Sequence, residues 1–250
     1  MSERMRELVD KIRRKWKRMR LQPIRVYVVH NVSAEYSTKQ GPKADWMSVE
    51  DFRHSICELK KQSTFISIDE AIWHLKNDRI RLKDYVVLTA DDGYKSVYNQ
   101  LPWLIENKVP ITLFINPKYL EGKSYSAHIW EFVHAHHPEI TEEEFVKGRY
   151  MTGEELASIT SPLVTIGSHG YDHTDNGKMS ESEFREYMEM AIKGIEKYHV
   201  FTPYHAYPWG NYSETSDKVL GEMGICPLRA DGRYNEEDSS QLHREFLPKI

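Results

Sequence analysis

The chain lacks long apolar runs and has few cysteines. The chain has 250 residues, and none of its apolar stretches approaches the roughly 18 residues that a helix needs to span a bilayer. The sequence therefore excludes a transmembrane helix. Residues 1–20 are studded with charge and lack the apolar centre of a secretory signal. Two cysteines, Cys57 and Cys226, cannot build a disulfide framework or a cysteine-rich metal site. We therefore expect a soluble protein of a reducing compartment, the cytoplasm, although an exported chain without its leader would have the same composition.

Positive charge is scarce outside the first twenty residues. Residues 1–20 contain nine Lys and Arg and three Asp and Glu, a net charge of +6, whereas the whole chain carries −4 and residues 21–250 therefore carry −10. Nucleic-acid-binding proteins present a basic surface, so a body of this sign argues against a nucleic-acid partner. The sequence is silent on oligomeric state.

The N-terminal segment has a helical pattern of apolar residues among basic ones. We predict a basic amphipathic helix over residues 1–22, preceding one domain over residues 23–250. The helix either packs its apolar stripe against the body or docks peripherally on an anionic membrane. The stripe consists of Met5, Leu8, Val9, Ile12, Trp16 and Met19.

Short apolar runs then alternate with helical patterns. This alternation predicts parallel strands with crossover helices, an α/β barrel or a doubly wound sheet. We predict strands over 24–29, 85–90, 111–115, 163–167, 204–207 and 246–250. We predict helices over 49–61, 68–77, 94–107 with a kink near Pro102, 142–147, 152–160 and 180–198. The charged stretch that contains His128, His134, His136 and His137 is expected to be a solvated loop.

Polar clusters follow four of these strands. His30 ends the first, Asp91 and Asp92 end the second, the stretch Ser168–His173 follows another, and Pro208–Gly210 follows the strand at 204–207. The carboxyl ends of parallel strands share one face, where functional groups collect in barrels. We therefore expect these clusters to lie close together.

Two aspartates and two histidines in these clusters have the chemistry of a metal site. Adjacent carboxylates repel unless a cation is near, and at a turn Asp91 and Asp92 can reach one site from different sides. His169 and His173, four residues apart, can converge on the same ion with one carboxylate. For each pair alone, a solvated turn or surface exposure stays open. A two-histidine, one-carboxylate set also suits Fe(II) oxygenases.

Three motifs in order carry a family resemblance. The stretches Thr89–Gly93, His169–His173 and Ala206–Gly210, with Tyr27–His30 before them and Phe246–Ile250 after, resemble the polysaccharide deacetylases with a NodB homology domain, carbohydrate esterase family 4. The resemblance covers roughly residues 24–250. It implies a distorted (β/α)7 barrel.

The resemblance also implies roles. Asp91 would be the catalytic base, and Asp92, His169 and His173 would hold one divalent metal, most often Zn²⁺. The backbone N–H of Trp209 would face the oxyanion, and we expect Tyr171, Pro208 and Gly210 to contact the sugar. The expected activity is removal of acetyl groups from N-acetylated sugars of a polysaccharide or glycan precursor.

The chain departs from the family pattern in several places, among them Ala90 in place of Phe in the first motif. Ala206 stands where many relatives carry the arginine that holds the base, as in a branch with Ala-Tyr-Pro-x-Gly, so the metal alone is expected to keep Asp91 ionised unless another Lys or Arg reaches it. Gly170 replaces Ser or Thr, and His243 is a poor match in register for the general acid. A catalytically silent carbohydrate-binding relative, or a deacylase of an O-ester or N-formyl sugar, therefore stays open.

Overall fold

The computed structural model describes residues 5, 6, 22–78, 80–122, 124–236 and 240–250. Of the predicted helix over 1–22, only three positions are described, so that prediction lies outside the described residues. No described helix is long and apolar enough to cross a membrane.

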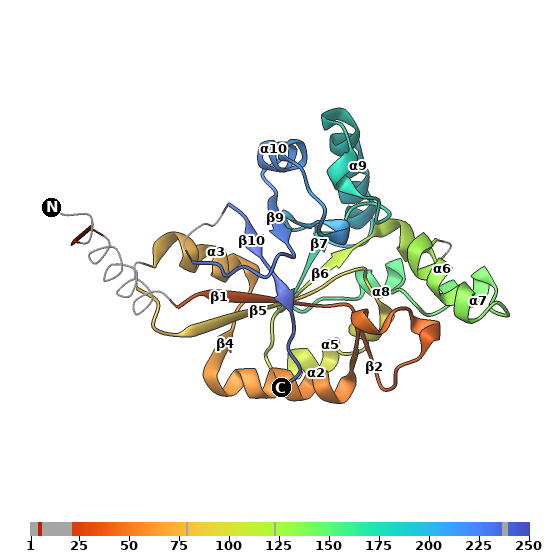
Figure 1. The fold of residues 1–250 in the computed structure, drawn as a ribbon, viewed down its shortest axis with the longest axis horizontal. Helices are drawn as coiled ribbons and strands as arrows, with labels where there is room; N and C mark the ends of the chain where they lie inside the picture. Colours follow the sequence, from red (N-terminus) through yellow and green to blue (C-terminus); the bar gives the residue numbers. More distant parts are fainter. Residues whose placement is uncertain (1–4, 7–21, 79, 123, 237–239) are drawn as a thin grey trace.

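A parallel sheet forms the centre of the molecule (Figure 1). Its described strands lie in the order β10-β9-β8-β7-β6-β5-β1-β11, with β4 beside the first half of β5. They are β1 (Ile24–Val29), β4 (Ser63–Phe65), β5 (Asp84–Ala90), β6 (Ile111–Ile115), β7 (Val164–Ser168), β8 (Tyr204–Ala206), β9 (Cys226–Arg229), β10 (Leu242–His243) and β11 (Glu245–Phe246). A separate pair joins β2 (Asn31–Ser33) to β3 (Trp46–Ser48).

The sheet nearly closes on itself. Its two end strands, β10 and β11, are consecutive in the chain and are separated by Arg244 alone. Arg244 N–H donates to Arg229 O at 2.7 Å, and Leu247 N–H donates to Val28 O at 3.1 Å, so this short stretch spans both ends of the strand order. The fold is thus the predicted distorted barrel.

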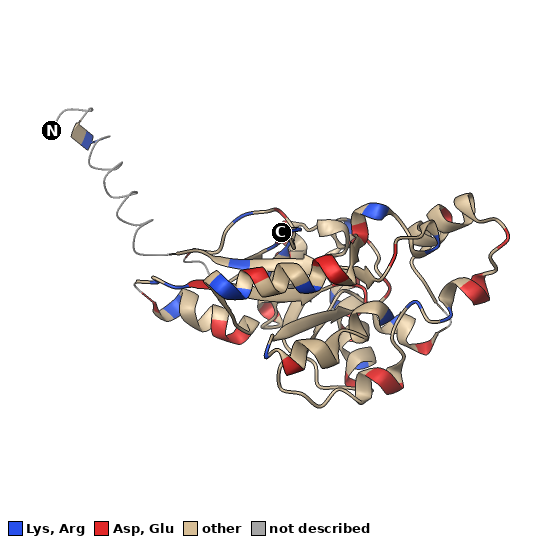
Figure 2. Cartoon of the chain, turned by 90° about the horizontal axis from the view of Figure 1, so that it is seen from below, with Lys and Arg blue, Asp and Glu red and all other residues tan. Residues whose placement is uncertain are grey.

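Helices surround the sheet, and most charged residues lie on their outer faces (Figure 2). They are α2 (Val49–Gln62), α3 (Ile68–Asn77), α4 (Lys95–Tyr98), α5 (Leu101–Glu106), α6 (Ala127–His136), α7 (Glu142–Val146), α8 (Gly153–Ala157), α9 (Glu181–Glu196) and α10 (Glu214–Glu222). Short 3-10 turns in the described residues follow several of the strands: η1 (Thr38–Gln40), η2 (Lys43–Asp45), η3 (Pro117–Glu121), η4 (Asn176–Lys178) and η5 (Pro208–Gly210). Strand β6 is buried over its whole length, as expected for a parallel strand covered on both faces.

Capping residues in the sequence correctly predicted the starts of two helices, α2 and α9. Ser48 accepts a hydrogen bond from Asp51 N–H at the start of α2, and Ser180 forms the predicted capping box of α9 with Glu183. The predicted helix over 94–107 is instead two helices, because α4 ends at Tyr98 and α5 restarts with Pro102 in its first turn.

Two predictions were wrong. The last strand is not 246–250 but the two residues of β11, because only Tyr27 and Val28 of β1 pair with it. The stretch expected to be a solvated loop contains α6, whose Ile129 and Val133 are buried against the neighbouring α7 segment.

Candidate active site

Three ligand atoms meet where β5 and β7 end. The Asp92 Oδ1 atom lies 3.4 Å from His169 Nε2 and 3.4 Å from His173 Nε2, and the three side chains form the one such group found among the described residues. They come from the two strand-end clusters that the sequence analysis singled out. The structure therefore brings together all three predicted metal ligands.

The spacing of these atoms fits a small divalent ion. Ligands of a tetrahedral zinc site, bonded at about 2.0–2.1 Å, lie roughly 3.3–3.4 Å from one another. Asp92 Oδ1 is buried and has no hydrogen-bond partner in the described part of the chain. A buried carboxylate oxygen without a donor is costly, and a cation between the three atoms would remove that cost.

Both histidines are held neutral, and His169 is also oriented by a hydrogen bond. Burial is the main cause that lowers the pKa of His169 and of His173 to about 4, so each ring keeps a lone pair near neutral pH. His169 Nδ1–H donates to Ala206 O at 2.8 Å, which turns Nε2 toward the site. Burial also raises the pKa of Asp92, an effect that a bound cation reverses.

The backbone around these ligands is in an uncommon conformation. Asp92, His173 and Trp209 have positive φ angles of 67°, 64° and 60°, in the left-handed region. Non-glycine residues persist there only where the surroundings enforce it, and such residues cluster at functional sites. The indole N–H of Trp209 donates to His173 O at 3.3 Å, which ties the loop after β8 to the loop after β7.

Asp91 forms a two-pronged ion pair with Arg244. Arg244 Nη1 and Nη2 donate to the two carboxylate oxygens at 2.7 and 2.9 Å, and both side chains are nearly inaccessible to solvent. Burial alone would raise the pKa of Asp91, but the charge and hydrogen bonds of Arg244, with His169 and His30 nearby, hold that pKa well below its usual range. Asp91 is therefore an ionised carboxylate.

Of the two alternatives for Asp91, the structure shows the one in which another arginine reaches the carboxylate. Ala206 indeed carries no charge, but Arg244 reaches the base from the segment that joins β10 to β11. The side chain comes from a different strand, and the guanidinium performs the task expected of the missing arginine. The partner of Asp91 is 153 residues away in sequence, so no local motif predicts it.

The loop over residues 169–174, which we call the histidine loop, is held by the hydroxyl of Tyr187, because Gly170 has no side-chain hydroxyl to do so. Tyr187 Oη on α9 accepts from Asp172 N–H at 3.2 Å and Thr174 N–H at 3.1 Å, and it donates to Asp172 Oδ1 at 3.2 Å. A Cβ atom at Gly170, whose φ is +77°, would lie 2.5 Å from Tyr187 Oη. Gly170 thus leaves the space that the tyrosine fills. Asn116 Nδ2 adds a further bond, to His169 O.

A cavity of about 430 Å³, the metal-site cavity, opens above these groups. Trp209 and Gly210 line it, together with Asp91 and the three candidate ligands. Tyr171 does not line it, because its ring packs among the apolar residues beneath α9. Pro208 is buried outside the lining.

Two histidines of the cavity were not predicted as site residues. His30 Nε2 lies 4.0 Å from Asp91 Oδ2, its buried Nδ1 has no partner in the described chain, and its ring is 5.6 Å from that of Phe246. His128, at the start of α6, lies edge-on to Trp209 at 5.1 Å. The position of His30 at a strand end was the available signal, whereas nothing in the sequence distinguished His128 from its neighbours.

His243, the weak candidate for the general acid, points elsewhere. Its Nδ1 atom is bonded to Asp231 at 2.9 Å, and it is absent from the lining of the metal-site cavity. Successive strand residues face opposite sides, so the burial of Arg244 in the barrel turns His243 away.

Comparisons with known proteins agree with this geometry. A family model described as polysaccharide deacetylase matches residues 78–228. The fold is similar to that of IcaB from Ammonifex degensii, with a TM-score of 0.70, 21% sequence identity and coverage of 92% of this chain and 94% of that one. It is also similar to the Streptococcus pyogenes deacetylase PplD in complex with acetate, with a TM-score of 0.69, 16% identity and coverage of 92% and 95%. A third similar structure is the deacetylase domain of BpsB from Bordetella bronchiseptica, with a TM-score of 0.65, 18% identity and coverage of 90% and 95%. No curated protein sequence matches significantly.

Proposed function

The chain belongs to the polysaccharide deacetylase family, and on this premise we propose that it removes acetyl groups from N-acetylated sugars of a glycan with the help of one divalent metal. One observation carries the proposal. The Nε2 atoms of two neutral histidines and an Asp92 oxygen without a hydrogen-bond donor converge beside the ionised carboxylate of Asp91, and all of these residues line one cavity.

We assign the metal to Asp92, His169 and His173, and Zn²⁺ is the ion that their nitrogen and oxygen atoms and their spacing favour. When bound, the ion would supply Lewis acidity, which polarises the amide carbonyl and makes the attacking water more acidic.

Asp91 accepts the proton of the attacking water. Its carboxylate is ionised because of Arg244, and it lies beside the ligand group, with Oδ2 3.9 Å from His169 Nε2. The ion pair also fixes the carboxylate in one orientation, so that one oxygen faces the cavity. The positive backbone φ of Trp209 sets the direction of its N–H, which we assign to the oxyanion of the tetrahedral intermediate.

We assign protonation of the leaving amine to His30. The ring lines the cavity, is packed against Phe246, and lies close enough to Asp91 for a proton to pass through one water. His128 is more exposed, and its ring lies edge-on to Trp209 without a hydrogen bond to any residue that the structure describes. A His30→Gln variant is therefore expected to lose turnover and keep the metal, whereas a His128→Gln variant keeps most of both.

The test is acetate release from N-acetylglucosamine oligosaccharides by the protein stripped of metal and then supplied with Zn²⁺ or another divalent ion. We expect release only with metal, and loss of at least a hundredfold in kcat for Asp91→Asn. Asp84→Asn, at the exposed opposite end of the same strand, is the matched control and is expected to match the wild type. Metal binding without release of acetate, formate or an O-acyl group would contradict an enzyme and favour a carbohydrate-binding protein; release of formate or of O-acyl groups alone would reassign the scissile bond.

A further inference from the structure

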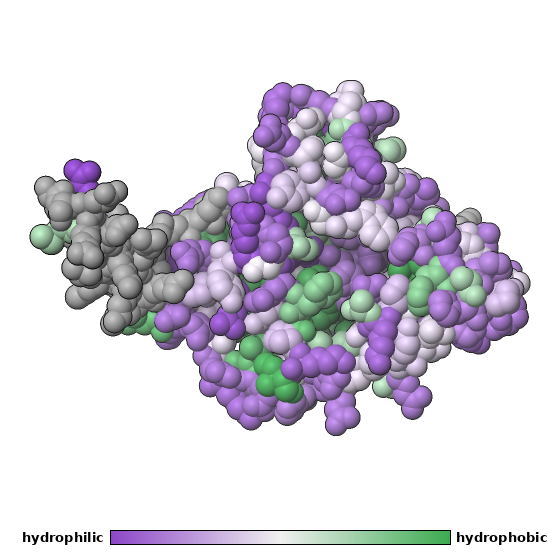
Figure 3. Space-filling view, in the orientation of Figure 1, coloured by the Kyte–Doolittle hydropathy of each residue, from purple (hydrophilic) through white to green (hydrophobic). Residues whose placement is uncertain are grey.

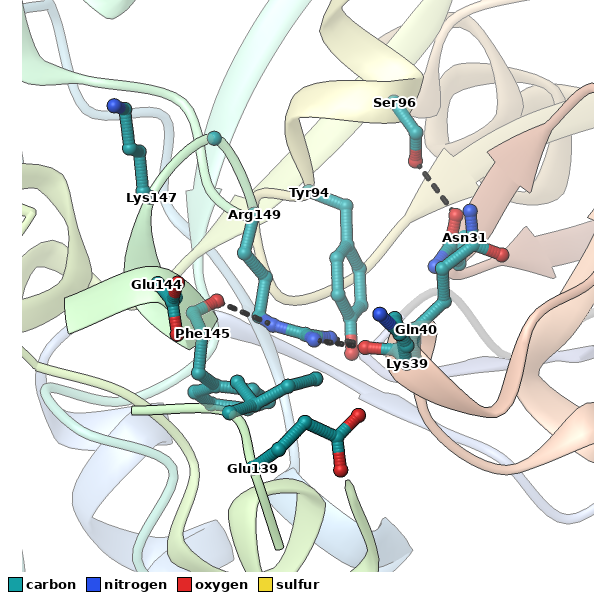
Figure 4. A pocket seen from close by; sticks show the side chains of 12 residues that line it. Asn31, Lys39, Gln40, Tyr94, Ser96, Glu139, Glu144, Phe145, Lys147 and Arg149 are labelled. Carbon is teal, nitrogen blue, oxygen red and sulfur yellow. Dashed lines mark hydrogen bonds between the residues drawn. The ribbon is translucent and has the colours of Figure 1, made fainter. Parts of the chain in front are cut away.

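The structure contains a second cavity of about 460 Å³ (Figure 4). Its lining comes from three segments: the start of β2 with the η1 turn, the stretch that follows Asp92, and the α7 segment up to Arg149. The proposed mechanism uses none of these residues.

Most of the free hydrogen-bonding groups in this second cavity are donors. Asn31 Oδ1 already accepts from Ser96 Oγ at 3.0 Å, and Gln40 Oε1 accepts from Ser33 Oγ at 3.1 Å. The amide NH₂ groups of Asn31 and Gln40 have no hydrogen-bond partner in the described chain. Both amides therefore have donors left for a ligand.

Arg149 adds a cation without an acidic partner among the described residues. Three of its five N–H groups are used by backbone carbonyls: Nη1 donates to Gln40 O at 2.8 Å, Nη2 to Lys39 O at 2.6 Å and Nε to Phe145 O at 3.2 Å. The guanidinium lies 3.9 Å from the centre of the Phe145 ring and faces the nearly buried Tyr94 hydroxyl. If the tyrosine oxygen accepts from Arg149, the O–H of Tyr94 is left to donate.

The two acids of the lining are already engaged. Glu139 lies 3.2 Å from His137 Nδ1, and Glu144 accepts from the N–H and the hydroxyl of Thr141 in a capping box. Lys39, in contrast, has no ion pair in the described residues and stands at the rim. The lining therefore offers amide, phenol, guanidinium and ammonium donors, and its three cations, Lys39, Lys147 and Arg149, exceed its two carboxylates. This pattern suits an anionic oxygen group.

The second cavity adjoins the metal-site cavity. His30 lines the metal-site cavity and the next residue, Asn31, lines the second one. The loop that contains η1 and η2 stands between them, because Gln40 faces the second cavity and Pro42 and Asp45 face the metal site. A glycan chain that crosses this loop would bring a sugar next to the acetylated one to the second cavity.

From this juxtaposition we propose that the second cavity binds a carboxylate or phosphate group on a sugar adjacent to the acetylated one. The proposal rests on the proposed function for the identity of the acetylated sugar, but the anion site itself does not need catalysis. The preferred substrate is then an acidic glycan, and the cavity selects it over a neutral one.

Titration calorimetry with inorganic phosphate and with D-glucuronate, on the metal-loaded protein, tests the site directly. We expect Tyr94→Phe and Lys39→Ala each to weaken binding at least fivefold. Lys147→Ala is the matched control: it lines the same cavity, but its side chain points away from the donor group in Figure 4, so the affinity should stay within twofold. Preference for phosphate would indicate a phosphorylated glycan, and preference for glucuronate a uronate.

Activity supplies the second arm. The kcat/KM for an acidic N-acetylated oligosaccharide should be at least five times that for its neutral counterpart. In Lys39→Ala this ratio should fall toward one. Absence of anion binding by the wild type, or equal weakening by Lys39→Ala and Lys147→Ala, would overturn the proposal. Anion binding without acetate release from any glycan would overturn the proposed function and leave the anion site standing.

Discussion

At the scale of single residues, Arg244 supplies the positive charge beside Asp91 that Ala206 does not. The position next to the base in the third motif is Ala206, yet the base has a buried, two-pronged arginine partner. Removing one member of such a buried pair leaves an unpaired charge, at a cost of about 3–5 kcal/mol. The guanidinium therefore contributes to both the stability of the barrel and the ionisation of Asp91.

Replacing Arg244 with Lys or Met is expected to shift the pH dependence of catalysis. Arg244 lowers the pKa of Asp91, and the base works only when ionised, so removing the guanidinium moves the acidic limb of kcat/KM to higher pH. An opposite charge at this distance is worth about 1–3 pH units, with Arg244→Met shifted more than Arg244→Lys. The measurement is kcat/KM from pH 4 to 9, with circular dichroism to verify folding.

Arg185→Met, which removes an exposed arginine of α9, is the control for this experiment. Its profile should coincide with that of the wild type. An unchanged acidic limb in both Arg244 variants would show that another group sets the ionisation of the base.

At the scale of elements, the histidine loop depends on α9. The hydroxyl of Tyr187 is the acceptor for two backbone N–H groups between His169 and the end of the loop. Loss of that oxygen leaves both donors without a partner and loosens the backbone that aims His173. The helix thus positions the candidate ligands through the loop that carries them.

Tyr187→Phe is expected to weaken metal affinity by about 10–100-fold, as is typical for groups that orient metal ligands. Competition with a chromophoric chelator measures it. Tyr198→Phe, just beyond the end of α9, is the control and should keep the wild-type affinity. A Tyr187→Phe affinity within twofold of the wild type would show that the loop holds its shape without the hydroxyl.

The sequence predicted those features of the fold and the site that depend on strand ends and on helix-capping residues. The carboxyl ends of β5 and β7 carry Asp92, His169 and His173, and parallel strands bring such ends together whatever lies between them. It did not predict Arg244, because its contact with Asp91 depends on how the barrel closes. Tyr171 was misplaced because the motif gives no direction for the side chain between the two ligand histidines.

At the scale of the whole molecule, the face of the barrel drawn in Figure 3 has apolar residues surrounded by polar ones. Figure 3 shows hydrophobic atoms gathered near the centre of this face, in the region of β11 in Figure 1. Phe246 of β11 is 60% exposed and Trp209 is 49% exposed, and both line the metal-site cavity. Exposed aromatic rings beside a polar floor are the surface that a sugar ring stacks on. The amphipathic helix over residues 1–22 stays a prediction, which salt-sensitive binding to anionic vesicles would test.

The central claim assigns different roles to two adjacent aspartates, and metal content together with kcat in Asp91→Asn and Asp92→Asn tests it most directly. We expect about one metal ion per chain in the wild type and in Asp91→Asn, with turnover lost in the latter. Asp92→Asn should lose the metal and the activity together, because its Oδ1 atom faces both ligand histidines. An Asp91→Asn protein without metal beside an Asp92→Asn protein that retains it would contradict the account.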